Sequence, residues 1–125
     1  MNYLSIKEAV ELHDEILEIS GGKRGYNDVS LGYLTSALEQ IKNDIFYPSI
    51  IEKVAHLMFS CIKFHPFLDG NKRTSIYLAM IFLDFNGIDV QDFAQKMEDV
   101  VVDVAENKIS KEGLFEILKK IVKEQ

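Results

Sequence analysis

Apolar residues recur every three or four positions along almost the whole chain of 125 residues. This spacing puts them on one face of an α-helix, whereas a half-buried strand would alternate apolar and polar residues. The pattern predicts six helices: from 5 to a loop at 20–28, about 29–41, 49 to about 64, 71–85, about 89 or 90 to 106, and 110 to about 122. We therefore expect an all-α protein.

Two of these helices carry a capping signal at their start. Ser5 is followed three residues later by Glu8, and Ser49 is followed three residues later by Glu52. In such a capping box the serine hydroxyl and the glutamate carboxylate each accept a hydrogen bond from the other residue's backbone N–H. The two pairs predict where the first and third helices begin.

The helix predicted over 71–85 differs from the others in its pattern. It is apolar nearly all round from Ile76 to Leu83, and a helix without a polar face is normally buried. We therefore expect it to be the centre of the bundle.

Length and composition limit the classes of protein that fit. A chain of 125 residues with 47% apolar residues is expected to form a single domain over 1–125 with its own core. The net charge of −6 and the pI near 5.0 argue against a nucleic-acid-binding protein, which normally carries a basic face.

Cellular location is also constrained by the sequence. Cys61 is the single cysteine, which excludes an internal disulfide, and its apolar surroundings predict a buried, unreactive thiol. The longest uncharged stretch near the motif, 74–83, is too short to span a bilayer, and no signal peptide is evident at the start. We expect a cytoplasmic protein without a membrane partner.

One ten-residue stretch, 65–74 (HPFLDGNKRT), holds most of the candidate chemistry. Pro66 disfavours helical geometry at the residue before it, so the third helix should end near 64 or 65. Asp69-Gly70 is a turn signal, and the next helix should start at Asn71. The stretch is therefore predicted to be a short loop between two helices.

The start of that next helix is a candidate phosphate site. Helix N-termini offer unpaired N–H groups and a partial positive charge, which together bind anions. Lys72 and Arg73 add two cations at an end where cations are otherwise unfavourable. We interpret Gly70, Asn71, Lys72 and Arg73 as a phosphate-binding turn; an ordinary helix start with two solvated basic residues is the simpler alternative.

The loop adds a carboxylate and a base. Asp69 is a candidate ligand for Mg²⁺, which proteins commonly hold through one or two carboxylates plus substrate phosphates. His65 is a candidate general base that could take a proton from an attacking hydroxyl. Each residue alone is more often structural, but the combination at this spacing indicates phosphate chemistry.

The stretch resembles the signature of the Fic/Doc family, His-x-Phe-x-(Asp/Glu)-(Gly/Ala)-Asn-(Gly/Lys)-Arg. The matching residues are His65, Phe67, Asp69, Gly70, Asn71 and Arg73. Members of this family move part of a nucleoside triphosphate onto a protein hydroxyl. The resemblance covers nearly the whole chain and implies the Fic/Doc fold, a bundle of six or seven helices around a central helix, with ATP and Mg²⁺ as cofactors.

Two departures from the AMP-transferring branch resemble the death-on-curing (Doc) toxins instead. This chain has Lys72 where that branch usually has glycine, and Ile76 where it usually has a second arginine. Doc toxins are described as protein kinases that modify elongation factor Tu. The resemblance implies that His65 is the base in γ-phosphate transfer to a Ser or Thr hydroxyl, which would block translation. AMP transfer, a non-enzymatic relative and a metal-dependent hydrolase are the alternatives.

The resemblance also implies two partner surfaces. The segment Ile45-Phe46-Tyr47 corresponds to a short hairpin, the flap, which aligns the target backbone as an added strand; alternatively these residues only cover the edge of the core. Doc toxins are restrained by an antitoxin whose disordered tail folds into a groove.

Two further features are interpreted as structural. His13 lies on the apolar stripe of the first helix, and we interpret it as a buried, hydrogen-bonded residue outside the catalytic set. The segment 20–28 contains three glycines but lacks the spacing of a P-loop, so we interpret it as a connecting loop.

Overall fold

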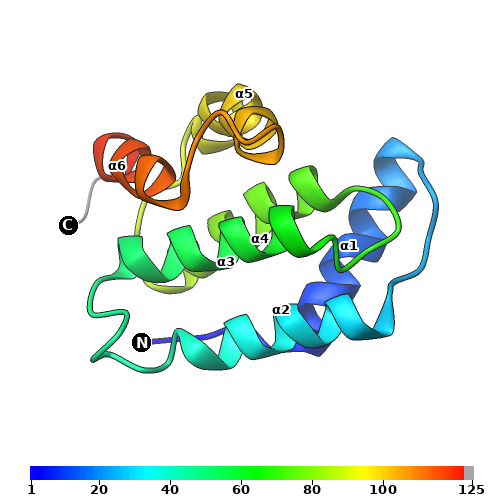
Figure 1. Cartoon of the computed structure of the whole chain (residues 1–125), viewed down its shortest axis with the longest axis horizontal. Helices are drawn as coiled ribbons and strands as arrows, with labels where there is room; N and C mark the ends of the chain where they lie inside the picture. The colour runs from blue at the N-terminus through cyan, green and yellow to red at the C-terminus, as the bar shows by residue number, and fades with distance from the viewer. Residues whose placement is uncertain (123–125) are drawn as a thin grey trace.

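The computed structural model describes residues 1–122, which form six α-helices without any strand (Figure 1). The helices are α1 (Ile6–Ser20), α2 (Asp28–Gln40), α3 (Ile50–Phe64), α4 (Asn71–Phe85), α5 (Phe93–Ala105) and α6 (Lys111–Ile121). The expected all-α fold is confirmed. None of the helices in this range combines the length and the apolar character that crossing a membrane requires.

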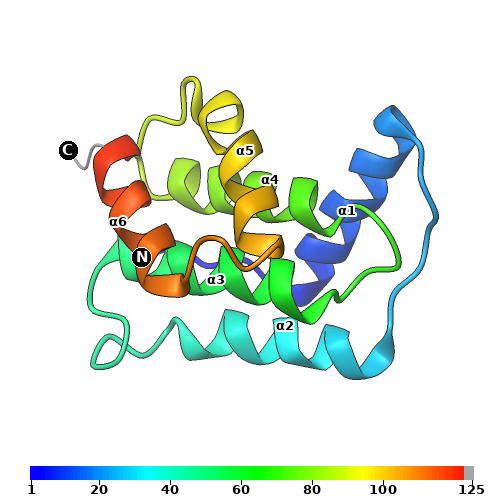
Figure 2. The ribbon, with the colours of Figure 1, turned by 45° about the horizontal axis from the view of Figure 1, so that its top comes forward.

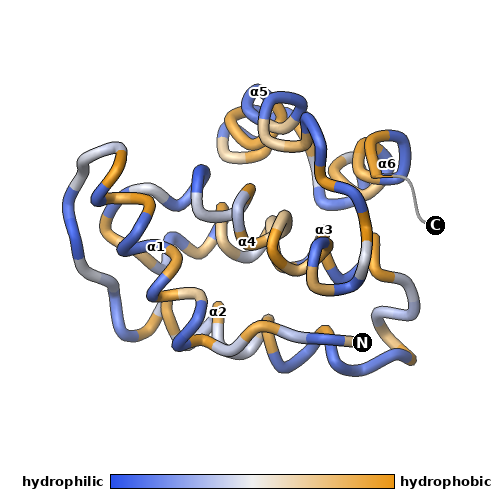
Figure 3. The backbone as a smooth tube through the Cα atoms, turned by 180° about the vertical axis from the view of Figure 1, so that it is seen from behind, coloured by the Kyte–Doolittle hydropathy of each residue, from blue (hydrophilic) through white to orange (hydrophobic). Residues whose placement is uncertain are grey.

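The helices are arranged around α3 and α4. On one side α2 packs against α3 and α1 packs against α4, while α5 and α6 cover the other side (Figures 1 and 2). Hydrophilic residues follow the outer turns of α2 and α5 (Figure 3). The apolar stripes read from the sequence therefore face a common core between the layers.

The centre of the bundle is a pair of helices rather than α4 alone. α3 packs against α2, α4, α5 and α6, and it buries ten of its 15 residues. α4 packs against α1, α3 and α5, but its Tyr77 is 37% exposed. The apolar pattern of α4 correctly predicted that it belongs to the core. The equally central position of α3 follows only from the helices that pack against it.

The predicted helix starts are largely confirmed. The Ser5 hydroxyl accepts a hydrogen bond from the Glu8 N–H (3.1 Å), and the Glu8 carboxylate accepts one from the Ser5 N–H (3.0 Å), which completes the first capping box. The Ser49 hydroxyl likewise accepts from the Glu52 N–H (3.1 Å). The Glu52 carboxylate lies instead against the Ser49 hydroxyl (3.3 Å), so the second box is half formed.

The fifth helix begins at Phe93, later than the predicted 89 or 90. The Asp89 side chain accepts a hydrogen bond from the Gln91 N–H (3.0 Å), which forms a turn. Asp92 then adopts a left-handed conformation with φ 63°, through which a right-handed helix cannot run. The local preference of aspartate for turns outweighs the helical spacing of the apolar residues here.

The segment 43–48 between α2 and α3 is a series of turns, so the predicted flap hairpin is wrong. The Asn43 side-chain oxygen accepts hydrogen bonds from the N–H groups of Ile45 (2.9 Å) and Phe46 (3.3 Å). The Asn43 carbonyl also accepts one from the Tyr47 N–H (2.9 Å). These local bonds occupy the backbone groups that a hairpin would pair across strands.

A buried lysine fastens this segment to α3. Lys53 is fully buried, and its ammonium donates to the carbonyl of Ile41 and to the carboxylate of Asp44 (2.7 Å). Burial opposes the charge of Lys53, but the hydrogen bonds with Asp44 and Tyr3 outweigh it and raise the pKa of Lys53. The hydrogen bond from Lys53 lowers the pKa of Asp44. The sequence pattern gave no sign that this lysine points inward.

Candidate functional site

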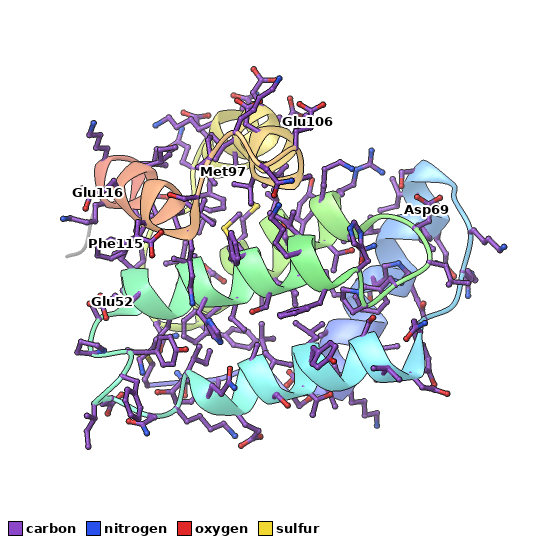
Figure 4. The ribbon with its side chains drawn as sticks, in the orientation of Figure 1. Glu52, Asp69, Met97, Glu106, Phe115 and Glu116 are labelled. Atoms are coloured by element: carbon purple, nitrogen blue, oxygen red, sulfur yellow. The ribbon has the colours of Figure 1, made fainter. Side chains whose placement is uncertain are left out.

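The loop 65–70 joins α3 to α4 at one end of the molecule, where Figure 4 labels Asp69. α3 ends at Phe64 as predicted, and His65 follows in a left-handed conformation (φ 49°, ψ 59°). This conformation is uncommon outside glycine, although histidine tolerates it better than most residues. Such backbone outliers concentrate at functional sites.

The His65 side chain is exposed. Within residues 1–122, ring hydrogen bonds involve His13 and His56 but not His65. Both of its ring nitrogens are therefore available to exchange a proton with a ligand, as the predicted general base requires.

The loop between α1 and α2 pairs directly with the loop 65–70. The Asn27 N–H donates to the Pro66 carbonyl (3.0 Å), and the Leu68 N–H donates to the Gly25 carbonyl (3.0 Å). Tyr26 and Phe67 thereby form an antiparallel bridge. The segment 21–27, interpreted from sequence as a plain connection, is thus one side of the site.

His13 supports the loop from beneath. It is 1% exposed, its Nε2–H donates to the Asp69 carbonyl (2.7 Å), and its ring stacks on that of Phe67 with centroids 3.8 Å apart. Its Nδ1 lies 3.5 Å from the Asp14 carboxylate. The interpretation of His13 as a buried, hydrogen-bonded residue is confirmed, and the structure adds that it fixes the Asp69 backbone.

Both loops hold the Asp69 carboxylate. One oxygen accepts from the Gly70 N–H (2.9 Å) and the other from the Lys23 N–H (3.1 Å). Gly22 has φ 128°, and a Cβ there would lie 2.9 Å from the Asp69 carboxylate, so glycine is required for this approach. The carboxylate is exposed and keeps further lone pairs for a ligand.

The start of α4 offers unpaired donors. Its first residue is preceded by Gly70 (φ 78°), and no side chain caps it. The N–H groups of Asn71, Lys72 and Arg73 have no backbone or side-chain partner within residues 1–122. The left-handed conformation of Gly70 favours glycine, and a Cβ there would lie 3.3 Å from the Leu17 side chain, so a larger residue would need Leu17 to shift.

The two cations of the turn are also unpaired. Lys72 and Arg73 are exposed, and the ion pairs found in residues 1–122 include neither of them. On a protein of net charge −6, two neighbouring cations without a carboxylate partner form a local positive site. Lys63 does not join it, because its ammonium is hydrogen-bonded to Asn107.

The Asn71 side chain is used by the loop itself. Its oxygen accepts from the Phe67 N–H (2.9 Å), and its amide donates to the Phe67 carbonyl (2.8 Å). Of the groups on Asn71, the backbone N–H therefore remains for an anion, while the side chain sets the shape of the loop.

The segment Ile45-Phe46-Tyr47 is not part of this site. It precedes α3, whereas His65 follows it, and 15 helical residues at about 1.5 Å each separate the two ends by about 22 Å. Figure 4 shows Glu52, in the first turn of α3, and Asp69, beyond the end of α3, at opposite ends of the molecule. Target binding by these residues stays a prediction, but it would take place away from His65, since Ile45 and Phe46 are exposed at the far end of α3.

A third histidine, His56, belongs to a separate polar cluster. Its Nε2–H donates to the Gln40 side chain (2.7 Å), the Lys111 ammonium donates to its Nδ1 (2.8 Å), and the Tyr47 hydroxyl lies 3.4 Å away. Burial and the nearby charge of Lys111 lower the pKa of His56 to about 4. The ring is therefore neutral at pH 7 and serves as a structural link between α2, α3 and α6.

The structure also bears on the reactivity of the Cys61 thiol and on metal binding. Cys61 is fully buried, which raises the pKa of its thiol to about 12, as expected for an unreactive cysteine. No group of three or more His, Cys, Asp or Glu side chains in residues 1–122 is placed to hold a metal ion. A cation at Asp69 would therefore need further ligands from a substrate and water.

The fold and the site define a class of protein: an all-helical domain in which two interlocked loops present a histidine, a carboxylate and an uncapped helix N-terminus. The model of the Fic/DOC family matches residues 3–83, which span α1, α2, α3, the whole loop and most of α4. This chain belongs to the Fic/DOC family.

Two relatives share this family likeness. "Protein kinase doc" of Escherichia phage P1 is 28% identical over 124 residues, which are 97% of this chain and 96% of the relative. "Toxin Doc" of Mycolicibacterium smegmatis is 39% identical over 61 residues, 47% of either chain. The first likeness therefore includes α5 and α6, which the family match does not reach.

Proposed function

We propose that this protein is a toxin that transfers the γ-phosphate of ATP to a Ser or Thr hydroxyl of a protein target, with elongation factor Tu as the candidate target. One observation carries the proposal: the loop with exposed His65 and Asp69 leads directly into the uncapped start of α4. Asp69 is held by two backbone N–H groups, and the start of α4 has free N–H groups and two unpaired cations. The names of the two relatives, a protein kinase and a toxin, support the same assignment.

Phosphates would bind at the start of α4. Their oxygens accept hydrogen bonds from the backbone N–H groups of Asn71, Lys72 and Arg73, and the two cationic side chains offset the charge on the transferring group. Because phosphoryl transfer needs mainly positioning and charge stabilisation, this arrangement supplies most of what the reaction requires.

His65 would act as the general base. Its free ring nitrogen accepts the proton of the target hydroxyl as that oxygen attacks the γ-phosphorus. The new O–P bond forms, the bond between the γ-phosphorus and the bridging oxygen breaks, and ADP leaves with the electron pair. General-base assistance of this kind contributes about 10²- to 10⁴-fold in rate.

The Asp69 carboxylate fits a role as a Mg²⁺ ligand. Its two hydrogen bonds to backbone N–H groups fix its position and leave lone pairs unused. When bound, Mg²⁺ would neutralise charge on the phosphates. Because residues 1–122 contain no group of three or more metal-binding side chains, the phosphates and water would complete the coordination.

The segment 21–27 offers an edge for the target in place of the segment 45–47. Gly25 and Asn27 use their backbone groups toward the motif, so the N–H and carbonyl of Tyr26 point to the opposite side. An extended target segment could pair there as an added strand next to the motif. Tyr26→Pro removes the outward N–H together with the tyrosine side chain, so Tyr26→Ala, which keeps the N–H, is the control. Tyr26→Pro should lower transfer to the target more than Tyr26→Ala and leave nucleotide affinity unchanged.

The decisive experiment uses ATP labelled separately at the α- and γ-phosphates. The purified protein is incubated with Mg²⁺, elongation factor Tu and each label, with His65→Asn as the inactive control. Label from γ-labelled ATP alone supports the kinase. A gain of one AMP on the target would overturn it in favour of nucleotidyl transfer.

A toxin of this kind would be restrained by an antitoxin, for which we propose a small protein with a disordered tail. Expression of the wild-type chain alone should arrest bacterial growth, and co-expression of the adjacent small open reading frame should relieve the arrest. Equal growth of cells that express soluble wild-type and His65→Asn protein would contradict the toxin assignment.

A further inference from the structure

A cleft lies between α4 and α5, directly beside the proposed phosphate turn. It has a volume of about 260 Å³. Its lining residues are Lys72, Arg73, Ile76, Tyr77, Ala94, Glu98, Val101 and Val102. Figure 2 shows α5 running across α4 on the side away from α1. The first turn of α4 thus contributes both to the proposed phosphate turn and to the wall of this cleft.

The chemistry of the cleft changes from α4 to α5. The exposed cations Lys72 and Arg73 come from the first turn of α4, the apolar wall follows with Ile76 and Tyr77 one turn later, and the exposed carboxylate of Glu98 comes from α5. Glu98 forms no ion pair within residues 1–122. The cleft therefore combines cations for phosphates, an apolar and aromatic wall for the face of a base, and a carboxylate that can accept hydrogen bonds from the base or the sugar.

The cleft also has a suitable size and an aromatic side chain. Pockets for small molecules usually enclose about 300–1,000 Å³, so this one is suited to a nucleoside rather than to a larger ligand. Tyr77 is 37% exposed and Val102 is 40% exposed, although both line a recess. Aromatic side chains bind any nucleobase by stacking.

We propose that this cleft binds the nucleoside part of a purine nucleoside triphosphate, with the base against Tyr77 and its N–H groups donating to Glu98. The proposal rests on the proposed function, because the phosphates must lie at Lys72 and Arg73. A carboxylate only accepts hydrogen bonds. It therefore suits the two neighbouring N–H donors of guanine at least as well as the single amino group of adenine, so GTP should bind at least as tightly as ATP.

The first test separates the nucleoside from the phosphates. Isothermal titration calorimetry compares ATP, GTP and inorganic tripolyphosphate, each with Mg²⁺, on wild type and Tyr77→Ala. Loss of base stacking should weaken both nucleotides roughly 5- to 150-fold and leave tripolyphosphate unchanged. Phe85→Ala, which removes another exposed aromatic of α4 outside the cleft, is the matched control and should change neither.

The second test concerns Glu98. In Glu98→Gln the amide offers one acceptor and one donor, which suits the amino group and adjacent ring nitrogen of adenine. The ratio of GTP affinity to ATP affinity should fall about fivefold or more. Asp99→Asn, which makes the same change of charge at the next residue outside the cleft, should leave the ratio unchanged.

The outcomes distinguish this inference from the proposed function. If tripolyphosphate binds as tightly as ATP and GTP, or if Tyr77→Ala behaves like Phe85→Ala, the nucleoside site is wrong while the phosphate turn stands. If wild type binds none of the three ligands, the phosphate turn and the nucleoside site are both wrong. An unchanged ratio in Glu98→Gln would overturn the contact between Glu98 and the base.

Discussion

The two loops that flank α3, 43–48 and 65–70, differ in how their polar groups are used. At the first, Lys53 is satisfied by Ile41 and Asp44, and His56 is satisfied on both ring nitrogens. At the second, His65 lacks a partner in residues 1–122, and so do the N–H groups at the start of α4. Both loops are firmly anchored, but only the second keeps unused hydrogen-bonding capacity. This spare capacity, more than the presence of a histidine, distinguishes a candidate site from a structural cluster.

Replacement of His65 is expected to have the largest effect on phosphate transfer. It tests directly whether the loops 43–48 and 65–70 differ in function. His65→Asn removes the base but tolerates the left-handed backbone, so transfer should fall about 10²- to 10⁴-fold with little loss of stability. Transfer is measured with γ-labelled ATP and stability by thermal denaturation. The matched variant His56→Gln should keep near-normal transfer. Equal losses in both variants would show that the two loops do not differ in function.

Replacement of His13 should affect both stability and activity. His13→Phe keeps the stacking on Phe67 but leaves the Asp69 carbonyl without its donor, which should cost about 1–3 kcal/mol of unfolding free energy. Because Asp69 shifts, the affinity for Mg²⁺ should fall as well. Urea denaturation and Mg²⁺ titration of the activity measure the two effects. A variant with lower stability and unchanged Mg²⁺ dependence would limit His13 to core packing.

Replacement of Lys53 should affect stability alone. Lys53→Met keeps the apolar length of the side chain but leaves the buried Ile41 carbonyl unpaired, which should cost about 1–3 kcal/mol. The exposed Asp44 carboxylate regains water, so it adds little. Since this loop lies at the other end of α3, turnover per folded molecule should be unchanged. A fall in turnover at full folding would contradict the separation of the two regions.

Acidification should lower the unfolding free energy through the His56 cluster, and this is the smallest of the expected effects. The pKa of His56 is lowered from 6.5 to about 4 in the folded protein, so the unfolded chain binds its proton first as the pH falls. The stabilising contribution of neutral His56 is present above about pH 6.5 and is lost between there and about pH 4. After allowance for partial exposure, the loss is about 1–2 kcal/mol.

The pH effect is measured as the difference between wild type and His56→Gln, because carboxylates also titrate in this range. Urea denaturation at pH 4 and pH 7 gives the two differences in unfolding free energy. Wild type should lose more stability than His56→Gln on going to pH 4. Parallel pH profiles would show that His56 is not held neutral by its cluster.

Most helix boundaries and the conformation of the motif could be predicted from sequence because they depend on neighbouring residues. The Ser5 cap, the end of α3 before Pro66 and the turn at Gly70 all follow from interactions within about four residues. The start of α5 at Phe93 differs from the prediction, although the Asp89 turn is equally local, because the helical spacing of apolar residues already begins at Val90.

Other features depended on residues far apart in the chain. The pairing of 25–27 with 66–68, the hydrogen bond from His13 to Asp69 and the burial of Lys53 join segments whose contact no local pattern encodes. The position of 45–47 at the opposite end from His65 follows from the direction and length of α3 once it packs in the core.

The sequence by itself determined that the chain is helical and that one loop carries a histidine and a carboxylate directly before a helix start with two cations. Short-range sterics and capping bonds fix such features residue by residue. Only the tertiary structure decided which groups stay available, since that depends on what packs nearby: the Asn71 side chain is taken by Phe67, while the N–H groups of α4 remain free within residues 1–122. Burial and long-range hydrogen bonding make that selection, and both arise only when the helices pack together.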